Sequence, residues 1–250
     1  MNPTALIARK EAGELLLSLR GLAWLMAVAV ALSTFGLLLV SNTELSLLDN
    51  AQVVYDMVGI VTALGALLAL VVGIDAVAGE RERGSLVPLL LTPVSRDSIL
   101  LGKLGGVAIA WAVMYALALP YLWAVGSTGQ NLWQGMVVLA LLGSPVVLGF
   151  GFFGMGLGSL LATGRTGLLT GLISLIVSAS PLLLGPSLRQ SAVGRAFDTV
   201  NPFSAAVNAY DAVIIDSQTI PAQWEHIVVA AVWLALALWL ARFGFHRVAR

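Results

Sequence analysis

The sequence predicts an all-α, polytopic membrane protein with six transmembrane helices, an N-terminal amphipathic elbow helix and both termini in the cytoplasm. Three observations lead to this prediction. Hydrophobic residues make up 59% of the 250 residues and charged residues only 10%, whereas soluble domains carry about 25% charged residues. Six apolar runs are each long enough to cross a bilayer as a helix. Lysine and arginine gather on one side of these runs.

The first element is an elbow helix over residues 3–20. Its apolar side chains fall on one helical face, and its charged side chains fall elsewhere. The apolar face holds Ala5, Ala8, Ala12, Leu15, Leu16 and Leu19, and the charged residues are Arg9, Lys10, Glu11 and Glu14. Such a helix is expected to lie at the inner membrane surface, and a polar lead-in that frays is the alternative. The two acids distinguish this stretch from a secretory signal peptide.

Six spans follow, because a helix needs about 20 mostly apolar residues to cross roughly 30 Å of hydrocarbon. They cover residues 21–40, 57–78, 104–125, 136–161, 168–185 and 224–241. Strands of a membrane β-barrel would be about 10 residues long with alternating polarity, and these runs are longer and apolar on every side. Together the spans predict a single transmembrane domain over residues 1–250.

The positive charges orient the spans, because the cytoplasmic loops of membrane proteins hold an excess of lysine and arginine. With the N-terminus inside, 11 of the 13 lysines and arginines are cytoplasmic, and only Arg189 and Arg195 are outside. Those two lie in the outer segment 186–223, whose apolar content predicts one or two short helices capping the outer face. Within this segment, Asn201 and Pro202 predict a turn or a helix start.

Several kinds of chemistry are disfavoured. The chain has no cysteine and two histidines, so no metal site, disulfide or cysteine nucleophile is predicted. The only Gly-Lys pair, at 102–103, has Asp97 where a Walker A loop needs its first glycine, so no nucleotide site is predicted. No ionisable residue lies near the middle of a span, which disfavours a proton-coupled carrier and a membrane-embedded enzyme. Asp75, near the inner end of its span, is expected to pair with Arg81 or Arg83.

Glycines four residues apart occur in three places, at Gly102 and Gly106, Gly154 and Gly158, and Gly167 and Gly171. This spacing lets membrane helices approach each other closely. Packing within the chain is the plainer interpretation of these pairs. A flexible wall of a translocation path, or a contact between two copies of the chain, is the alternative.

The inner loop over residues 79–103 carries the most distinctive pattern. Two acid–base pairs at 80–83 are followed by Gly84, an apolar run too short to span, and Pro93. This pattern predicts a short helix lying along the inner face of the membrane. Its leucines could dock against another protein or anchor in lipid, and the spacing alone leaves both interpretations open.

This loop resembles the signature of type-2 ATP-binding-cassette (ABC) permeases. The resemblance rests on Glu-Arg-Glu-Arg-Gly-Ser-Leu at 80–86 and Leu-Leu-Thr-Pro-Val-Ser-Arg at 90–96. In that family the segment follows the second span and forms the coupling helix that contacts the ATPase subunit. The elbow helix, six spans, inner termini and outer Asn-Pro also match the family. A length near 250 residues is similar to its short bacterial members, including the permease type of nitrous-oxide-reductase maturation transporters.

The resemblance implies that the chain is the permease subunit of an ABC exporter in a bacterial or archaeal cytoplasmic membrane. A separate ATPase subunit would bind ATP and Mg²⁺, so this chain would not be an enzyme and would hold no cofactor. A second permease copy, forming a homodimer, and membrane lipid would be its other partners, with no nucleic acid. The alternative is an ATPase-driven coupler that acts on a periplasmic or membrane partner through the outer segment 186–223 without moving a substrate.

The resemblance also implies which residues meet the ATPase. The end of the second span and the turn after it would contribute Glu80, Arg81, Glu82, Arg83 and Gly84. The coupling helix and its exit would contribute Leu86, Leu89, Leu90, Thr92, Pro93 and Arg96. At such an interface, charges set orientation and association rate, while leucines in a groove supply most of the affinity. The few polar side chains in the spans favour an apolar or amphipathic substrate, for which no binding residue is predicted.

Overall fold

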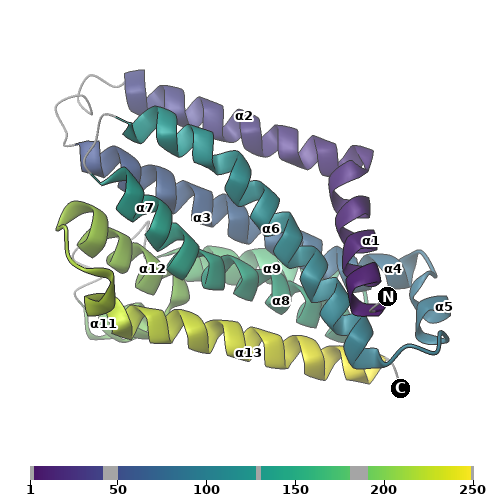
Figure 1. Cartoon of the computed structure of the whole chain (residues 1–250). Helices are drawn as coiled ribbons and strands as arrows, with labels where there is room; N and C mark the ends of the chain where they lie inside the picture. Colours follow the sequence, from purple (N-terminus) through teal and green to yellow (C-terminus); the bar gives the residue numbers. More distant parts are fainter. Residues whose placement is uncertain (1–2, 42–49, 128–130, 181–190, 249–250) are drawn as a thin grey trace.

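The computed structural model describes residues 3–41, 50–127, 131–180 and 191–248 of the chain (Figure 1), and in these ranges every regular element is a helix. Five helical stretches are long and apolar enough to cross a membrane. They are α2 (Leu19–Ser41), α3 (Asn50–Ile74), α6 (Arg96–Gly126), α7 with α8 (Leu132–Val138 and Ser144–Leu160) and α13 (Trp224–Val248). The π-helical turn η3 (Leu139–Gly143) joins α7 to α8 without a break. The prediction of an all-α, polytopic membrane protein is therefore confirmed.

The fifth expected span, 168–185, corresponds to α9 (Gly164–Ala179), which is apolar but shorter than the other spans. At 16 residues it rises about 24 Å. Residues 181–185 of the expected span lie outside the described residues. The prediction of a sixth full crossing therefore stays a prediction.

The helix expected over 3–20 is present as α1 (Pro3–Leu17), which crosses the end of the bundle at a steep angle to α2 (Figure 1). The chain bends at Ser18, whose hydroxyl accepts a hydrogen bond of 3.0 Å from the Gly21 amide. In Figure 1, α1 lies at the same end of the bundle as α4 (Glu80–Glu82), α5 (Leu86–Leu90) and the C-terminal end of α13. We call this end the α1 end.

Helix α8 forms the centre of the bundle, between α3 and α13, and its glycines set both contacts. On one face, a Cβ atom at Gly158 would lie 2.7 Å from the Ile74 carbonyl oxygen, and one at Gly154 would overlap the Leu70 carbonyl of α3. On the other face, Gly149 meets the Trp233 ring of α13. The backbones of α3 and α8 can approach this closely only because these positions lack side chains.

The other two glycine pairs also serve packing within the chain. Gly167 and Gly171 lie against Ile74 and Leu70 of α3, and Gly102 and Gly106 lie against Ile7 and Glu11 of α1. All six glycines are buried. Intrachain packing is thus the correct interpretation of these pairs, and the flexible wall and the contact between copies are not supported.

The described part of the outer segment forms α11 (Ala192–Val200) and α12 (Pro202–Tyr210), followed by η5 (Asp211–Ile215) and η6 (Ile220–Gln223). The predicted helix start is confirmed, because the Asn201 side chain accepts a hydrogen bond from the Phe203 amide at 2.9 Å. The two short helices that were expected are present, and α12 also enters the core. Nearly all of α12 is buried, and the Tyr210 hydroxyl lies 2.9 Å from the Thr62 hydroxyl of α3.

The position of α12 has a physical reason. The Asn201 amide group donates a hydrogen bond of 2.7 Å to the Ser178 carbonyl near the end of α9. Helix α12 therefore begins where the short α9 stops, and it fills the space beside α3 and α13 with apolar side chains such as Phe203. The segment is more apolar than a surface cap requires because it forms part of the core.

The α3–α8 contact yields a first test, Gly73→Val compared with Gly59→Val on the same helix. A Cβ atom at Gly73 would overlap the Gly151 carbonyl of α8, whereas one at Gly59 meets nothing within 4 Å. Overpacking against backbone costs about 1–3 kcal/mol or more. We expect Gly73→Val to lower the Tm of the purified protein by about 5–10 °C, and Gly59→Val to leave it unchanged. Equal Tm values for the two variants would contradict the close packing.

Candidate functional site

The candidate site is the segment of residues 79–96 at the α1 end, which we call the coupling segment. The π-helical turn η2 (Asp75–Gly79) continues α3 into α4, and Gly84 then reverses the chain with a φ of 73°, which side-chain-bearing residues rarely adopt. The Ser85 amide donates a hydrogen bond of 3.0 Å to the Glu80 carbonyl and closes this turn. Helix α5 follows, and α6 begins at Arg96, well before the expected start of the span at Leu104.

The predicted short helix is present as α5, and its two faces differ. Leu86 is buried, and Leu89 and Leu90 are half-buried against the core. Val87 and Leu91, one helical turn apart, have 63% and 81% of their surface exposed. The three leucines singled out from the sequence therefore attach α5 to the core. The exposed apolar pair was missed, although its i, i+4 spacing was a readable signal.

Helix α5 ends with polar and exposed residues. The Thr92 hydroxyl donates to the Leu89 carbonyl at 2.7 Å and covers the last turn. Thr92, Pro93 and Arg96 are all exposed. The Ser95 hydroxyl accepts a hydrogen bond from the Ser98 amide and caps the start of α6.

Two of the four charged residues at 80–83 tie the coupling segment to the turn between α8 and α9. The Arg81 guanidinium donates to the Leu161 and Ala162 carbonyls at 2.6 and 3.1 Å. The Glu82 carboxylate accepts a hydrogen bond of 2.7 Å from the Gly164 amide at the start of α9. A carboxylate at a helix N-terminus is stabilised by the unpaired amides there.

A third charged residue, Arg83, turns back onto its own helix. Its guanidinium contacts the Asp75 carboxylate at 2.7 Å and donates to the Gly79 carbonyl at 3.0 Å. The predicted pairing of Asp75 is thus confirmed with Arg83, while Arg81 takes the other contacts. About half of each side chain in the Asp75–Arg83 pair is exposed, so water screens the pair and it adds little to stability.

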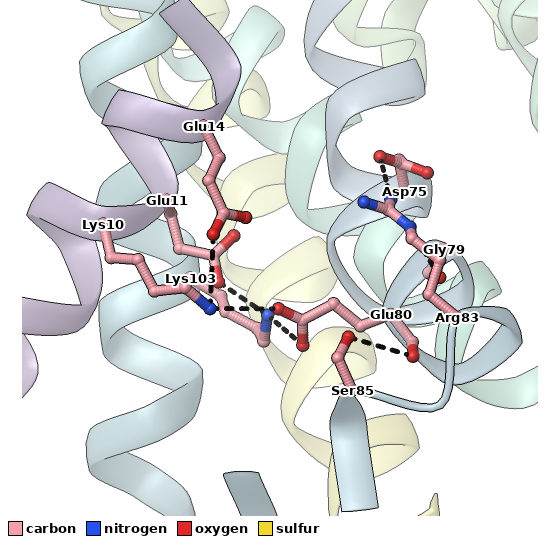
Figure 2. Close-up of polar contacts among 9 residues, drawn as sticks. All are labelled: Lys10, Glu11, Glu14, Asp75, Gly79, Glu80, Arg83, Ser85 and Lys103. Carbon is pink, nitrogen blue, oxygen red and sulfur yellow. Dashed lines mark hydrogen bonds and ion pairs between the residues drawn. The ribbon is translucent and has the colours of Figure 1, made fainter. Parts of the chain in front are cut away.

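The fourth, Glu80, is buried in an ion cluster with Lys103 of α6 and Glu11 of α1 (Figure 2). The Lys103 ammonium lies 2.7 Å from a carboxylate oxygen of each glutamate, and its side chain has no exposed surface. Lys10 lies at the rim, 4.0 Å from Glu80 and 3.4 Å from Glu14. Two buried carboxylates thus share one buried ammonium, with a second, half-exposed ammonium nearby.

Sequence reasoning missed this cluster. It placed Glu11 on the polar face of the elbow helix, and that is wrong because Glu11 is buried against α6. The ion pair joins residues 92 positions apart, so no local pattern could indicate it. Burial raises the pKa of Glu11 above its usual 4.5, and the neighbouring Lys103 opposes that rise.

Beside the cluster lies a cleft of about 860 Å³, lined by the α1–α2 junction, α3, α4 and the start of α9. Its walls are mostly apolar, with Leu25 and Leu68 among them, and its rim carries Glu14, Arg83 and Arg165. Among the described residues, no three His, Asp or Glu side chains come together as metal ligands would. The cleft suits an amphipathic molecule better than a metal or a charged nucleotide.

The raised pKa of Glu11 gives a second test, the pH dependence of stability in wild type and Glu11→Gln. Because the folded state holds this proton at a pH where the unfolded chain has lost it, the Glu11 contribution to stability falls as pH rises above about 4.5. Lys103, Glu80 and Lys10 face this position in both proteins. We expect the Tm of wild type relative to Glu11→Gln to decrease from about pH 4 to pH 7. Parallel Tm profiles, or the opposite trend, would contradict the burial of an ionisable Glu11.

Comparison with known proteins identifies the family. The family model for ABC-2 family transporter proteins matches residues 5–249. The chain is 30% identical over 158 residues to the probable ABC transporter permease protein NosY of Stutzerimonas stutzeri, covering 57% of this chain and 56% of NosY. It is 32% identical over 167 residues to the Pseudomonas aeruginosa protein of the same name, covering 63% and 54%. The matches thus span little more than half the length of these relatives.

The family match runs through every described element, from α1 to the last turn of α13. The resemblance first indicated by the loop at 80–96 therefore extends to nearly the whole chain, and the chain belongs to the ABC-2 family of transporter proteins.

Proposed function

We propose that this chain is the permease subunit of an ABC exporter and that a separate ATPase subunit docks on the coupling segment. The observation that carries the proposal is the exposed apolar pair formed by Val87 on α5 and Leu91 at its C-cap. Exposed apolar side chains on a firmly held helix are typical of protein–protein contacts. Thr92, Pro93 and Arg96 would complete this surface. The excess of lysine and arginine at the α1 end supports a cytoplasmic location for it and for both termini.

The way α5 is held supports this role. A five-residue helix is not stable alone in water, so it must depend on its attachments. Leu86 is buried in the core, and the turn before α5 is tied through Arg81 and Glu82 to the start of α9. A push on α5 would therefore reach α3, α6 and α9 together instead of being lost in a mobile loop.

We propose that ATP and Mg²⁺ bind to the partner and that this chain binds no cofactor and catalyses no reaction; the lack of a Walker A pattern in the sequence supports this. Because one chain supplies few spans, the assembly would hold two permease copies and two ATPase subunits in a bacterial or archaeal cytoplasmic membrane. The cleft between α2, α3 and α9 lies where ATPase closure would act. Its apolar walls and charged rim support an amphipathic or lipid-like substrate, and the outward direction follows the family resemblance.

A second function, an ATPase-driven coupler without a transported substrate, is favoured by one observation. Helix α11, at the opposite end of the bundle, has Val193 and Val200 with 80% and 70% of their surface exposed. An apolar stripe on that side could contact an extracytoplasmic partner. ATP-dependent release of an amphipathic substrate from vesicles would support the exporter, and ATP-dependent remodelling of a bound partner without such release would support the coupler.

Co-purification of the chain with an ATPase from its native membranes tests the docking surface, using Leu91→Asp and Leu17→Asp. The two leucines are almost equally exposed, at 81% and 80%, but only Leu91 lies on the coupling segment. Interface hot spots lose about 2 kcal/mol or more on truncation, which is roughly 30-fold in affinity. We expect an ATPase with wild type and Leu17→Asp, and at least a tenfold loss of it with Leu91→Asp at equal expression. Equal recovery with both variants would show that α5 is not the docking site.

A further inference from the structure

The buried ion cluster joins three helices that are distant in the sequence. Glu11 belongs to α1, Glu80 begins α4 in the coupling segment, and Lys103 lies in the first part of α6 (Figure 2). Both ion pairs have an N–O distance of 2.7 Å, and the three side chains are almost fully buried. A charged lysine is rarely buried unless it is paired. Its only ion-pair partners among the described residues are these two glutamates.

The packing of α1 on α6 is shaped around this lysine. Gly102 and Gly106 lie on either side of Lys103, and Cβ atoms there would lie 2.6 Å from Ile7 and from Glu11. The missing side chains let α1 lie directly on α6, which brings the Glu11 carboxylate within reach of the ammonium. The close packing and the ion pair therefore depend on each other.

The cluster is also joined directly to the coupling helix. Glu80 contacts Lys103 through its side chain, while its own carbonyl accepts hydrogen bonds from the Ser85 amide and hydroxyl at 3.0 and 3.3 Å. Ser85 is the residue immediately before α5. An unbroken series of short contacts thus leads from α5 through Glu80 and Lys103 to Glu11.

We propose that Lys103, Glu11 and Glu80 are positioning residues that make the elbow helix α1 move together with the coupling segment. Resting on the proposed function, this inference gives the ATPase a second route into the bundle. Movement of α5 would pass to α1 and, across the bend at Ser18, to α2. Buried ion pairs suit this task because sliding α1 past α4 would leave a buried charge without its partner, at a cost of several kcal/mol.

The two buried links can be removed separately. Glu11→Met detaches α1 from Lys103 and leaves Glu80 and Lys103 as a balanced pair. Glu80→Met detaches the coupling segment and leaves Glu11 and Lys103 balanced, so α1 stays seated on α6. Glu14→Met is the matched control, because Glu14 lies on α1 but is exposed, and its one ion pair within the described ranges is with Lys10 at 3.4 Å.

The movement of α1 can be measured by spin labels, since the natural chain contains no cysteine. One label at Leu6→Cys lies on the exposed side of α1, and the other at Glu225→Cys lies at the far end of α13. Labelled chain is diluted into excess unlabelled chain, so that a dimer carries one labelled copy. The complex with the co-purified ATPase is measured in nanodiscs, with and without ATP in the presence of vanadate.

We expect ATP to shift the distance between the two labels in wild type and in Glu14→Met. The shift should be lost in both Glu11→Met and Glu80→Met, each measured on complexes that have retained the ATPase. A shift of wild-type size in either variant overturns the inference, as does the absence of a shift in wild type. Loss of the shift in Glu11→Met alone also overturns the inference, because the variant would then only have loosened the packing of α1 on α6. Failure to recover any ATPase with wild type instead overturns the proposed function.

Discussion

The close approach of α3 and α8 is the contact on which the other features of this chain depend. Inside a membrane, lipid tails are as apolar as leucine, so helices associate through close packing and not through the hydrophobic effect. Gly154 and Gly158 bring α8 against the α3 backbone at Leu70 and Ile74, while Gly149 accepts Trp233 of α13 on the opposite face. This contact runs to the α1 end of the bundle. It therefore fixes where α3 ends and where the coupling segment begins.

From that fixed point, the coupling segment is attached by a different kind of contact. Towards α8 and α9, Arg81 donates hydrogen bonds and Glu82 accepts one, and towards α6 and α1 the segment uses the buried ion pairs that Lys103 makes with Glu80 and Glu11. Such contacts are directional, and they stabilise the structure less when the partner group slides out of position. Apolar packing tolerates small shifts more easily, because it has no preferred direction. The coupling segment is thus attached firmly to the helices that a push on α5 would have to move.

The sequence predicted most of the fold and the short helix of the coupling segment, because both follow from local patterns. Apolar length identified the long helices, and the motif at 80–96 identified the short helix α5. What it could not give was orientation around each helix axis. Nothing in the order of residues indicates that Glu80 turns inwards to Lys103 and Glu11, since that requires α1 to lie on glycines of α6. The burial of α12 was missed for another reason, because it depends on where the short helix α9 ends.

The directions in which these side chains point change the interpretation of the loop motif. From the sequence alone, its four charges suggest a polar docking surface, and its leucines suggest an apolar one. In the structure, Glu80, Arg81, Glu82 and Arg83 all contact groups of the same chain. The apolar side chains that remain exposed here are Val87, which lies between the two quoted strings, and Leu91, the second residue of the later string. The charged part of the motif therefore supports the helix from within the chain, and Val87 and Leu91 are left exposed.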